Sequence, residues 1–128
     1  MLQVPQTPRV PDPPSLGAHG EDLAAEWYSA RGFYVLARNW RCRVGEIDLI
    51  VGLGDLLVFC EVKTRSSDRF GAGWEAVTAR KQAKLRSLAG VFLSTEPALR
   101  GARVRFDVAS VAIASGLRPT VEVFEDAF

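Results

Sequence analysis

Two stretches of the chain, separated by a short turn, carry the residues best suited to chemistry. Asp48 lies in the first stretch, and Glu61 follows thirteen residues later with Lys63 two positions beyond it. Carboxylate oxygens suit Mg²⁺ or Mn²⁺, and a carboxylate-bound Mg²⁺ keeps positions that phosphate oxygens can occupy. Such a cation would activate water for attack on a phosphodiester, while Lys63 would orient that water or stabilise developing charge. The spacing therefore predicts metal-dependent phosphodiester hydrolysis by these three residues.

These residues belong to two predicted strands. Residues 46–51 and 56–63 are rich in aliphatic and aromatic side chains. They flank residues 52–55, whose glycines and aspartate are typical of a tight turn between antiparallel strands. The pattern predicts a β-hairpin, and the polar, glycine-bearing residues that follow it predict a loop.

The register of this hairpin decides whether the carboxylates meet. Side chains alternate between the two faces of a strand, so a shift of one residue would move Asp48 to the face opposite Glu61. A loop formed by residues 53–54, or by 52–55, gives paired residues whose numbers sum to 107. Glu46 then lies opposite Glu61, with Asp48 as its diagonal neighbour. We therefore expect an even-numbered loop and a supporting role for Glu46.

Charged residues that alternate along a strand also have a simpler interpretation. They can form a solvated face with cross-strand ion pairs and no catalytic role. Three features favour a site: the strand is otherwise apolar, the carboxylates come from two strands joined by one turn, and Thr64-Arg65 continue the polar run where the strand ends. On the residues alone, both interpretations stay open.

Hydrophobic periodicity predicts the other elements. Apolar side chains at three- and four-residue steps indicate two amphipathic helices, and short apolar runs indicate further strands. The helices are expected over residues 20–31 and from 74 or 78 to 93, and the strands over 33–37, 104–113 and 120–124. The second helix is too long to be a hairpin loop. An α/β fold with a central mixed β-sheet flanked by helices is the economical arrangement.

The length and composition are those of one globular domain. The chain has 128 residues, of which 48% are hydrophobic and 24% charged, and it can bury a core without disulfides. Five of its seven prolines fall in the first fourteen residues. We therefore expect a disordered Pro-rich tail over residues 1–16 and a domain over 17–128. Without an apolar run that suits a membrane span or a secretory signal, no membrane partner and a cytoplasmic location are expected.

Nucleic-acid binding would have to come from local basic patches, because the net charge is only +1. Basic residues cluster near Trp40 before the hairpin, at the end of its second strand, and on the second helix. The candidates are Arg41, Arg43, Arg65, Arg80, Lys81 and Lys84. Cations near an aromatic ring suit phosphate contact and base stacking, although solvated faces would have the same composition.

Four other residues with reactive side chains are not expected to do chemistry. Cys42 and Cys60 lie in β-type segments without a CxxC pattern or a histidine nearby in sequence, so buried or half-buried thiols are expected and not a zinc site. His19 lies at the edge of the tail. Asp107 lies inside an apolar strand and is expected to pair with an arginine for structural reasons.

The segments Gly45-Glu46-Ile47-Asp48-Leu49-Ile50 and Glu61-Val62-Lys63-Thr64-Arg65 resemble the YraN-like family of small bacterial proteins. The likeness runs from about residue 20 to 128. That family is similar to the restriction-endonuclease-like superfamily, whose PD-(D/E)xK motif matches Asp48 and Glu61-Val62-Lys63. Within the superfamily it is similar to archaeal-type Holliday-junction resolvases. Ile47 stands where the motif has proline.

The resemblance implies an αβββαβ restriction-endonuclease-like core, a Mg²⁺-dependent or Mn²⁺-dependent nuclease ancestry, and branched or structured DNA as the ligand. In resolvase-like members a glutamate on the first helix completes the metal site, and Glu21 matches that position. As an acidic residue in a predicted first turn, Glu21 could equally favour the helix dipole, even with the resemblance taken into account. Resolvase-like relatives act as dimers, so a homodimer is a further expectation.

Fold likeness does not establish an activity, so three functions stay open. The first is an endodeoxyribonuclease that uses a divalent cation. The second is a non-catalytic nucleic-acid-binding module that keeps the fold and the basic surface. The third is a protein-interaction domain in which the motif residues form a structural charge cluster.

Overall fold

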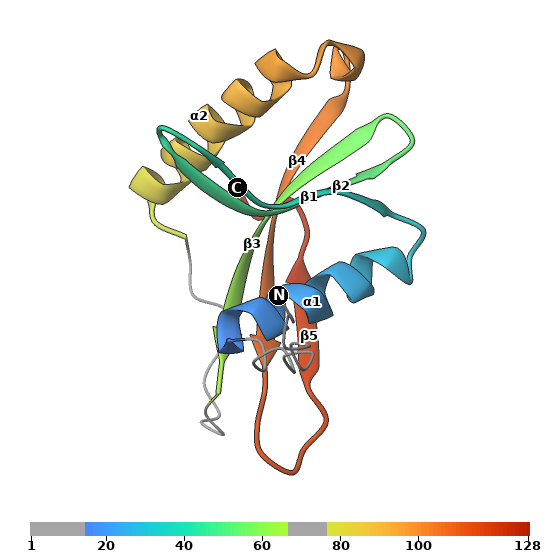
Figure 1. Cartoon of the computed structure of the whole chain (residues 1–128), viewed down its shortest axis with the longest axis vertical. Coiled ribbons are helices and arrows are strands. Elements are labelled where there is room, and N and C mark those ends of the chain that lie inside the picture. Colours follow the sequence, from blue (N-terminus) through green and yellow to red (C-terminus); the bar gives the residue numbers. More distant parts are fainter. Residues whose placement is uncertain (1–14, 67–76) are drawn as a thin grey trace, which may run out of the picture.

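A five-stranded mixed sheet organises the chain in the computed structural model, which describes residues 15–66 and 77–128 (Figure 1). The elements in chain order are α1 (Leu16–Ser29), β1 (Tyr34–Cys42), β2 (Gly45–Leu53), β3 (Leu56–Arg65), α2 (Ala79–Thr95), the short 3₁₀ helix η1 (Pro97–Leu99), β4 (Arg103–Ala112) and β5 (Thr120–Phe124). The strands lie in the order β1-β2-β3-β4-β5. All neighbours are antiparallel except β3 and β4, which are parallel.

This arrangement confirms the predicted α/β fold and is consistent with a restriction-endonuclease-like core. A parallel pair of strands needs a long crossover connection, and α2 lies within the connection between β3 and β4. The final strand β5 adds to the far side of β4. Neither of the two α-helices in the described residues is long and apolar enough to cross a membrane.

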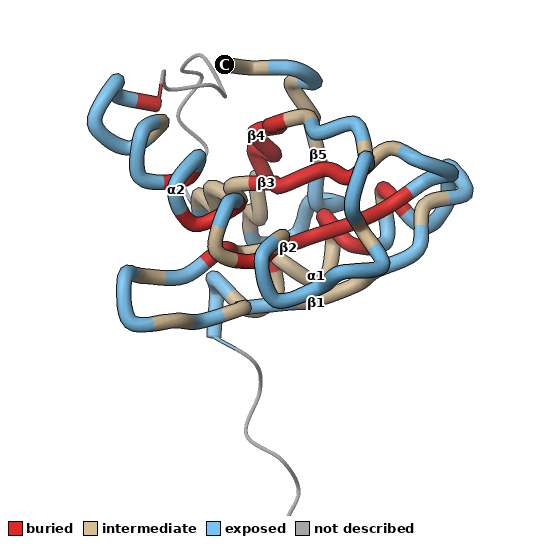
Figure 2. The backbone as a smooth tube through the Cα atoms, turned by 90° about the horizontal axis from the view of Figure 1, so that it is seen from above, coloured by how far each residue is buried: buried red, intermediate tan, exposed pale blue. Residues whose placement is uncertain are grey.

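The two helices cover opposite faces of the sheet, and each face has its own hydrophobic cluster. Buried residues run along β2, β3 and β4, while much of β1 and the turns is exposed (Figure 2). The cluster under α1 comprises Ala24, Ala25, Tyr28, Leu49, Val51, Val58, Cys60, Ala109 and Val111. The cluster under α2 comprises Ile47, Ile50, Leu57, Phe59, Val77, Leu85, Leu88, Ala89, Phe92, Phe106 and Val108. Because β3 is apolar on both faces between residues 57 and 60, it is the central strand of the core.

Helix α1 begins earlier than the predicted residue 20. Ser15 is its N-cap, and the Ser15 hydroxyl accepts a hydrogen bond from the Ala18 N–H at 3.2 Å, which satisfies one of the free donors of the first turn. The apolar periodicity starts later than this cap, so it marked only the part of the helix that packs. The predicted tail, apart from its last two residues, lies outside the described part of the chain.

Strand β1 is longer than the predicted 33–37. Its polar second half, up to Cys42, pairs with β2 down to Gly45, and a β-bulge interrupts the pairing between Val35 and Ala37. β1 is an edge strand of the sheet and needs no continuous apolar pattern, because one side of its backbone and much of its surface face water. The predictions for the later elements were closer. Strand β5 has its predicted bounds, β4 differs by one residue at each end, and α2 starts after its N-cap Thr78.

Gly20 sets how closely α1 approaches β3. A Cβ atom at this buried position would overlap the hydroxyl of Thr64 and lie 2.9 Å from the Thr64 Cβ. Gly17, one turn earlier in the same helix, has no such neighbour within 4 Å. We expect Gly20→Ala to lower the free energy of unfolding by about 1–3 kcal/mol through overpacking. Gly17→Ala is its matched control and should raise this free energy by about 0.5–1 kcal/mol.

Urea unfolding monitored by circular dichroism measures both changes. Equal stabilisation by the two substitutions would contradict the close approach of α1 to the end of β3.

Candidate active site

The β2–β3 hairpin has the predicted even-numbered loop, but its register differs from the expected one by two residues. Leu53 pairs with Leu56 around the two-residue loop Gly54-Asp55. The numbers of paired residues therefore sum to 109, as in Leu49 with Cys60. Gly54 has φ 57°, a left-handed conformation that glycine adopts without steric cost. Gly54 occupies the first position of the two-residue loop, and this placement determines the register of the hairpin.

The expected placement of Glu46 opposite Glu61 was therefore wrong. The pairing of β2 with β3 ends at Leu49 and Cys60, and the same register continued by one residue brings Asp48 level with Glu61. In place of a further backbone contact, the Asp48 carboxylate accepts a hydrogen bond from the Val62 N–H at 2.9 Å. Asp48 thus lies where the two strands separate, with its carboxylate held against β3.

The residues on either side of Asp48 in β2 pack in different hydrophobic clusters. Ile47 packs in the cluster under α2, whereas Leu49, two positions later, packs in the cluster under α1. In a regular strand, residues two apart share a face. Simple alternation therefore fails here, and Glu46 and Asp48 do not act as one row of carboxylates. Glu46 is exposed and instead accepts a hydrogen bond from Arg41 Nε at 3.0 Å.

Glu61 faces α2 and is held by a lysine from that helix. Its side chain is only 12% exposed, and Glu61 Oε1 lies 3.0 Å from Lys81 Nζ. Thr78 fixes the start of α2, because its hydroxyl accepts from the Lys81 N–H at 3.2 Å. Lys81, which the sequence predicted as a nucleic-acid contact, is in this structure the counter-ion of Glu61. The sequence contains no spacing that links residue 81 to Glu61.

Burial and like charge make Asp48 a weak acid in this setting. Burial is the main cause that raises its pKa from 3.8 to about 7, and the neighbouring carboxylates of Glu61 and Glu21 add to the rise. The Val62 N–H and the Lys81 ammonium oppose it. The free energy of ionising Asp48 is therefore high for a carboxyl group. A positive charge placed between the carboxylates would lower it.

Glu21 approaches the same region from α1. It is partly buried, its carboxylate accepts from Asn39 Nδ2 at 2.8 Å, and it contributes to the raised pKa of Asp48. Asn39 has a left-handed backbone (φ 50°) within β1. Yet within residues 15–66 and 77–128, no three His, Cys, Asp or Glu side chains are gathered closely enough to hold one ion together. The inner pair is Asp48 and Glu61, with Glu21 beside it.

The remaining predicted site residues surround this pair. Lys63 is partly buried on β3, and strand alternation places it on the same face as Glu61. Arg65 ends β3 and is partly buried too. The other predicted nucleic-acid contacts are exposed: Arg41 and Arg43 near the β1–β2 turn, and Arg80 and Lys84 on α2.

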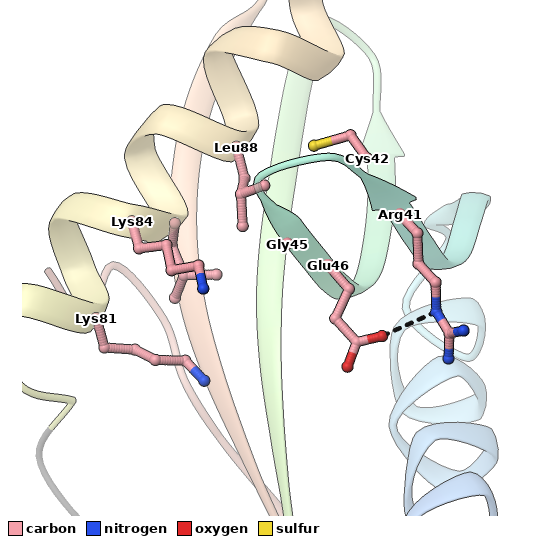
Figure 3. Close-up of a pocket in the computed structure, with 8 residues that line it drawn as sticks. Arg41, Cys42, Gly45, Glu46, Lys81, Lys84 and Leu88 are labelled. Atoms are coloured by element: carbon pink, nitrogen blue, oxygen red, sulfur yellow. Dashed lines mark hydrogen bonds and ion pairs between the residues drawn. The ribbon is translucent and has the colours of Figure 1, made fainter.

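A cavity of about 480 Å³ lies beside the Lys81–Glu61 ion pair, between the β1–β2 turn and α2 (Figure 3). Its lining residues are Arg41, Cys42, Gly45, Glu46, Lys81, Lys84, Leu85 and Leu88. Lys81 belongs both to this cavity and to the ion pair with Glu61. Lys81 therefore links the cavity to Glu61.

The cysteines and Asp107 behave as expected. Cys60 is fully buried, Cys42 is partly buried, and both are free thiols. Asp107 is fully buried and accepts two hydrogen bonds from Arg105, at 2.8 Å and 2.9 Å. It also accepts from the Tyr28 hydroxyl at 2.6 Å and from the Asp126 N–H at 3.0 Å. This network joins α1 to β4 and to the end of the chain. The tyrosine was the partner that sequence alone did not suggest.

Comparison with known proteins gives a consistent result. A family model described as "Uncharacterised protein family UPF0102" matches residues 20–111. A UPF0102 protein of Rhodococcus opacus (strain B4) is 49% identical over 114 residues, which cover 89% of this chain and 96% of that protein. One from Parafrankia sp. (strain EAN1pec) is 55% identical over 96 residues, covering 75% and 80%. One from Nocardia farcinica (strain IFM 10152) is 43% identical over 120 residues, covering 94% of each.

Proposed function

This chain belongs to the uncharacterised protein family UPF0102, the YraN-like family that its motifs resemble, and we propose that it is a nuclease-like protein. In this proposal it binds branched or structured DNA and hydrolyses phosphodiester bonds with a divalent cation. The observation that carries this proposal is the inner pair of carboxylates. Asp48 and Glu61 come from neighbouring strands, and Glu61 helps to raise the pKa of Asp48 to about 7. Lys81 offsets one of these negative charges, and a further positive charge between the two carboxylates would lower the free energy of ionising both.

The donor set fits Mg²⁺ or Mn²⁺. These ions prefer oxygen ligands, and Mg²⁺ in particular is often held by only one or two carboxylates while water and substrate phosphates complete its shell. Asp48 and Glu61 would hold the ion, and Glu21 would add negative charge beside it. Zinc is a poor fit, because it prefers histidine and thiolate ligands and this donor set consists of carboxylates.

The chain's own groups would then divide the work. When bound, the cation would polarise the phosphoryl group and lower the pKa of the attacking water. The Val62 N–H holds the Asp48 carboxylate at 2.9 Å, which fixes one ligand before substrate arrives. Lys63, on the same face as Glu61, would orient the water and stabilise charge that develops on the phosphate oxygens.

Without a bound cation, Lys81 is the positive partner of Glu61. Its ammonium lies 3.0 Å from Glu61 and is also near the charges of Asp48 and Glu46. A divalent cation that binds Glu61 would compete with this ammonium for the same oxygens. Since Lys81 also lines the cavity, we propose that it turns toward substrate phosphate when the cation binds.

Cleavage of a DNA panel tests the proposed function. Branched, nicked, single-stranded and blunt duplex DNAs would be incubated with the protein in Mg²⁺, in Mn²⁺ and in EDTA. The proposal expects cleavage of at least one branched or structured DNA in the presence of a cation, and none in EDTA. Binding without cleavage of any of these DNAs would favour the non-catalytic nucleic-acid-binding module.

Charge reversal on α2 separates DNA binding from a purely structural role. Lys84→Glu places a negative charge at the cavity, and it should weaken DNA affinity about tenfold at low salt and reduce the salt slope by about one. Arg100→Glu is the matched control, because Arg100 is exposed beside the hairpin loop Gly54-Asp55 and away from the carboxylates. Fluorescence anisotropy with labelled DNA measures both. Equal affinities for the two variants would argue against DNA contact at α2.

A further inference from the structure

We infer that the cavity between the β1–β2 turn and α2 binds one unpaired nucleotide of a DNA strand. This inference rests on the proposed function in one respect, namely that DNA is the ligand. It goes further by naming the feature of DNA that the protein recognises. The occupant is argued from the size, lining and charge of the cavity and from its position beside Glu61.

The cavity is large enough for a small ligand and is partly apolar. Its volume of about 480 Å³ falls within the range of roughly 300–1,000 Å³ that is usual for small-molecule sites. Leu85, Leu88 and Cys42 form the apolar wall of its lining, and Figure 3 shows Cys42 at the β1–β2 turn and Leu88 on α2. An apolar wall suits the face of a nucleobase.

The charged side chains that line the cavity are mostly positive. Arg41, Lys81 and Lys84 line it against the single carboxylate of Glu46. Arg41 is paired with Glu46, and Lys81 with Glu61. Within residues 15–66 and 77–128, Lys84 has no carboxylate within ion-pair distance. Its ammonium is therefore the group best placed to bind a phosphate.

The combination of apolar and cationic side chains in the lining discriminates between kinds of DNA. A blunt duplex presents phosphates to the cationic side chains, but its bases are stacked and paired and cannot contact the apolar wall. An unpaired nucleotide can satisfy both, and extruding a base from a duplex carries an energetic cost that an unpaired base avoids. The cavity therefore favours flaps, gaps and branch points over intact duplex.

The position of the cavity connects this recognition to the carboxylates. Lys81 lines the cavity and lies 3.0 Å from Glu61. A nucleotide held in the cavity would bring the phosphate of a neighbouring residue in the same strand toward Asp48 and Glu61. The strand would then approach these two carboxylates at the phosphate next to its unpaired nucleotide.

Protection of Cys42 from alkylation tests the inference directly. Cys42 lines the cavity, whereas Cys60 is fully buried and serves as an internal reference. The rate of N-ethylmaleimide labelling would be measured by mass spectrometry in EDTA, so that cleavage plays no part. The probes are a short oligothymidylate, a blunt duplex of equal length and inorganic phosphate. Cys42→Ser identifies the labelled position.

At saturating oligothymidylate we expect labelling of Cys42 to slow by at least about fivefold, while saturating duplex and phosphate slow it less than about twofold. Lys84→Gln should weaken the protection by oligothymidylate. Equal protection by single strand and duplex, or none by single strand, would overturn the inference. Cleavage of DNA without this protection would leave the proposed function standing and remove the inference. Protection of Cys42 without cleavage of any DNA would leave the inference standing and remove the proposed hydrolysis.

Discussion

Asp48→Asn is expected to abolish cation-dependent cleavage and, at the same time, to stabilise the cation-free fold at neutral and alkaline pH. Asparagine preserves the shape and can still accept the hydrogen bond that the Val62 N–H donates at 2.9 Å. It removes the charge on which cation binding depends. Because groups that stabilise the transition state electrostatically are each worth about 10²–10³ in rate, we expect a loss of at least that size.

The stability change follows from the pKa of Asp48, which is raised from 3.8 to about 7 by burial and by Glu61. A group whose pKa is higher in the folded state stabilises the fold fully below its unfolded pKa. This contribution is lost as the pH rises through its folded pKa. The ionisation of Asp48 therefore destabilises the wild type progressively between about pH 4 and pH 7. An asparagine side chain cannot ionise. We therefore expect the free energy of unfolding of Asp48→Asn to exceed that of the wild type by about 1–3 kcal/mol at pH 8 and to be similar to it at pH 4.

Asp55→Asn is the matched control for both effects. Asp55 lies on the same hairpin, is exposed, and pairs with Arg103 across the surface at 2.9 Å. Surface ion pairs contribute little to stability, so Asp55→Asn should leave the free energy of unfolding almost unchanged, and cleavage should be unaffected. Urea unfolding at pH 4 and pH 8, together with the DNA panel, measures both variants. A destabilised Asp48→Asn at pH 8 would contradict the crowding of carboxylates in this site.

Asp107→Ala is expected to cost about 3–5 kcal/mol of the free energy of unfolding. Asp107 is fully buried and satisfies three partners at once: the Tyr28 hydroxyl, the Arg105 guanidinium and the Asp126 N–H. Truncation leaves a guanidinium whose nearest other carboxylate, that of Glu125, lies 3.7 Å away. It also removes the acceptor of the buried Tyr28 hydroxyl. Burial and the charge of Asp107 raise the pKa of this hydroxyl far above its usual range.

Two companion variants keep this prediction specific. Asp107→Asn retains an acceptor for the Tyr28 hydroxyl but loses the charge opposite Arg105, so its cost should fall between those of the wild type and Asp107→Ala. Tyr28→Phe removes one hydroxyl and should cost about 1–2 kcal/mol. Urea unfolding measures all three. Since small domains are stable by only about 5–15 kcal/mol, Asp107→Ala should unfold at markedly lower denaturant. A cost below about 1 kcal/mol would show that the network does not support the fold.

Much of the fold could be predicted because its signals are local. The hairpin, α2 and the strands of the core carry apolar periods and turn residues that specify them, and Asp107 within an apolar strand required an arginine partner. The edge strand β1 could not be bounded in this way, because its polar half gains stability from pairing with β2 and not from burial. The start of α1 depends on the cap Ser15, which precedes the apolar pattern.

The site was harder to predict than the fold. Loops of residues 53–54 and 54–55 both contain two residues and both preserve the faces of the strands, so parity alone could not choose between them. The left-handed conformation of Gly54 at the first loop position distinguishes them in the structure. The packing of Ile47 and Leu49 in different clusters and the ion pair between Lys81 and Glu61 depend on tertiary packing. No spacing within the hairpin encodes either of them.

Titration calorimetry with Mg²⁺ and Mn²⁺ measures directly whether Asp48 and Glu61 hold a cation. We predict that the wild type and Asp55→Asn bind one ion with equal affinity at millimolar or lower concentration. Asp48→Asn and Glu61→Gln should show no binding in the same range. Failure of the wild type to bind either ion, or binding by Asp48→Asn as tight as that of the wild type, would show that these carboxylates do not form a cation site.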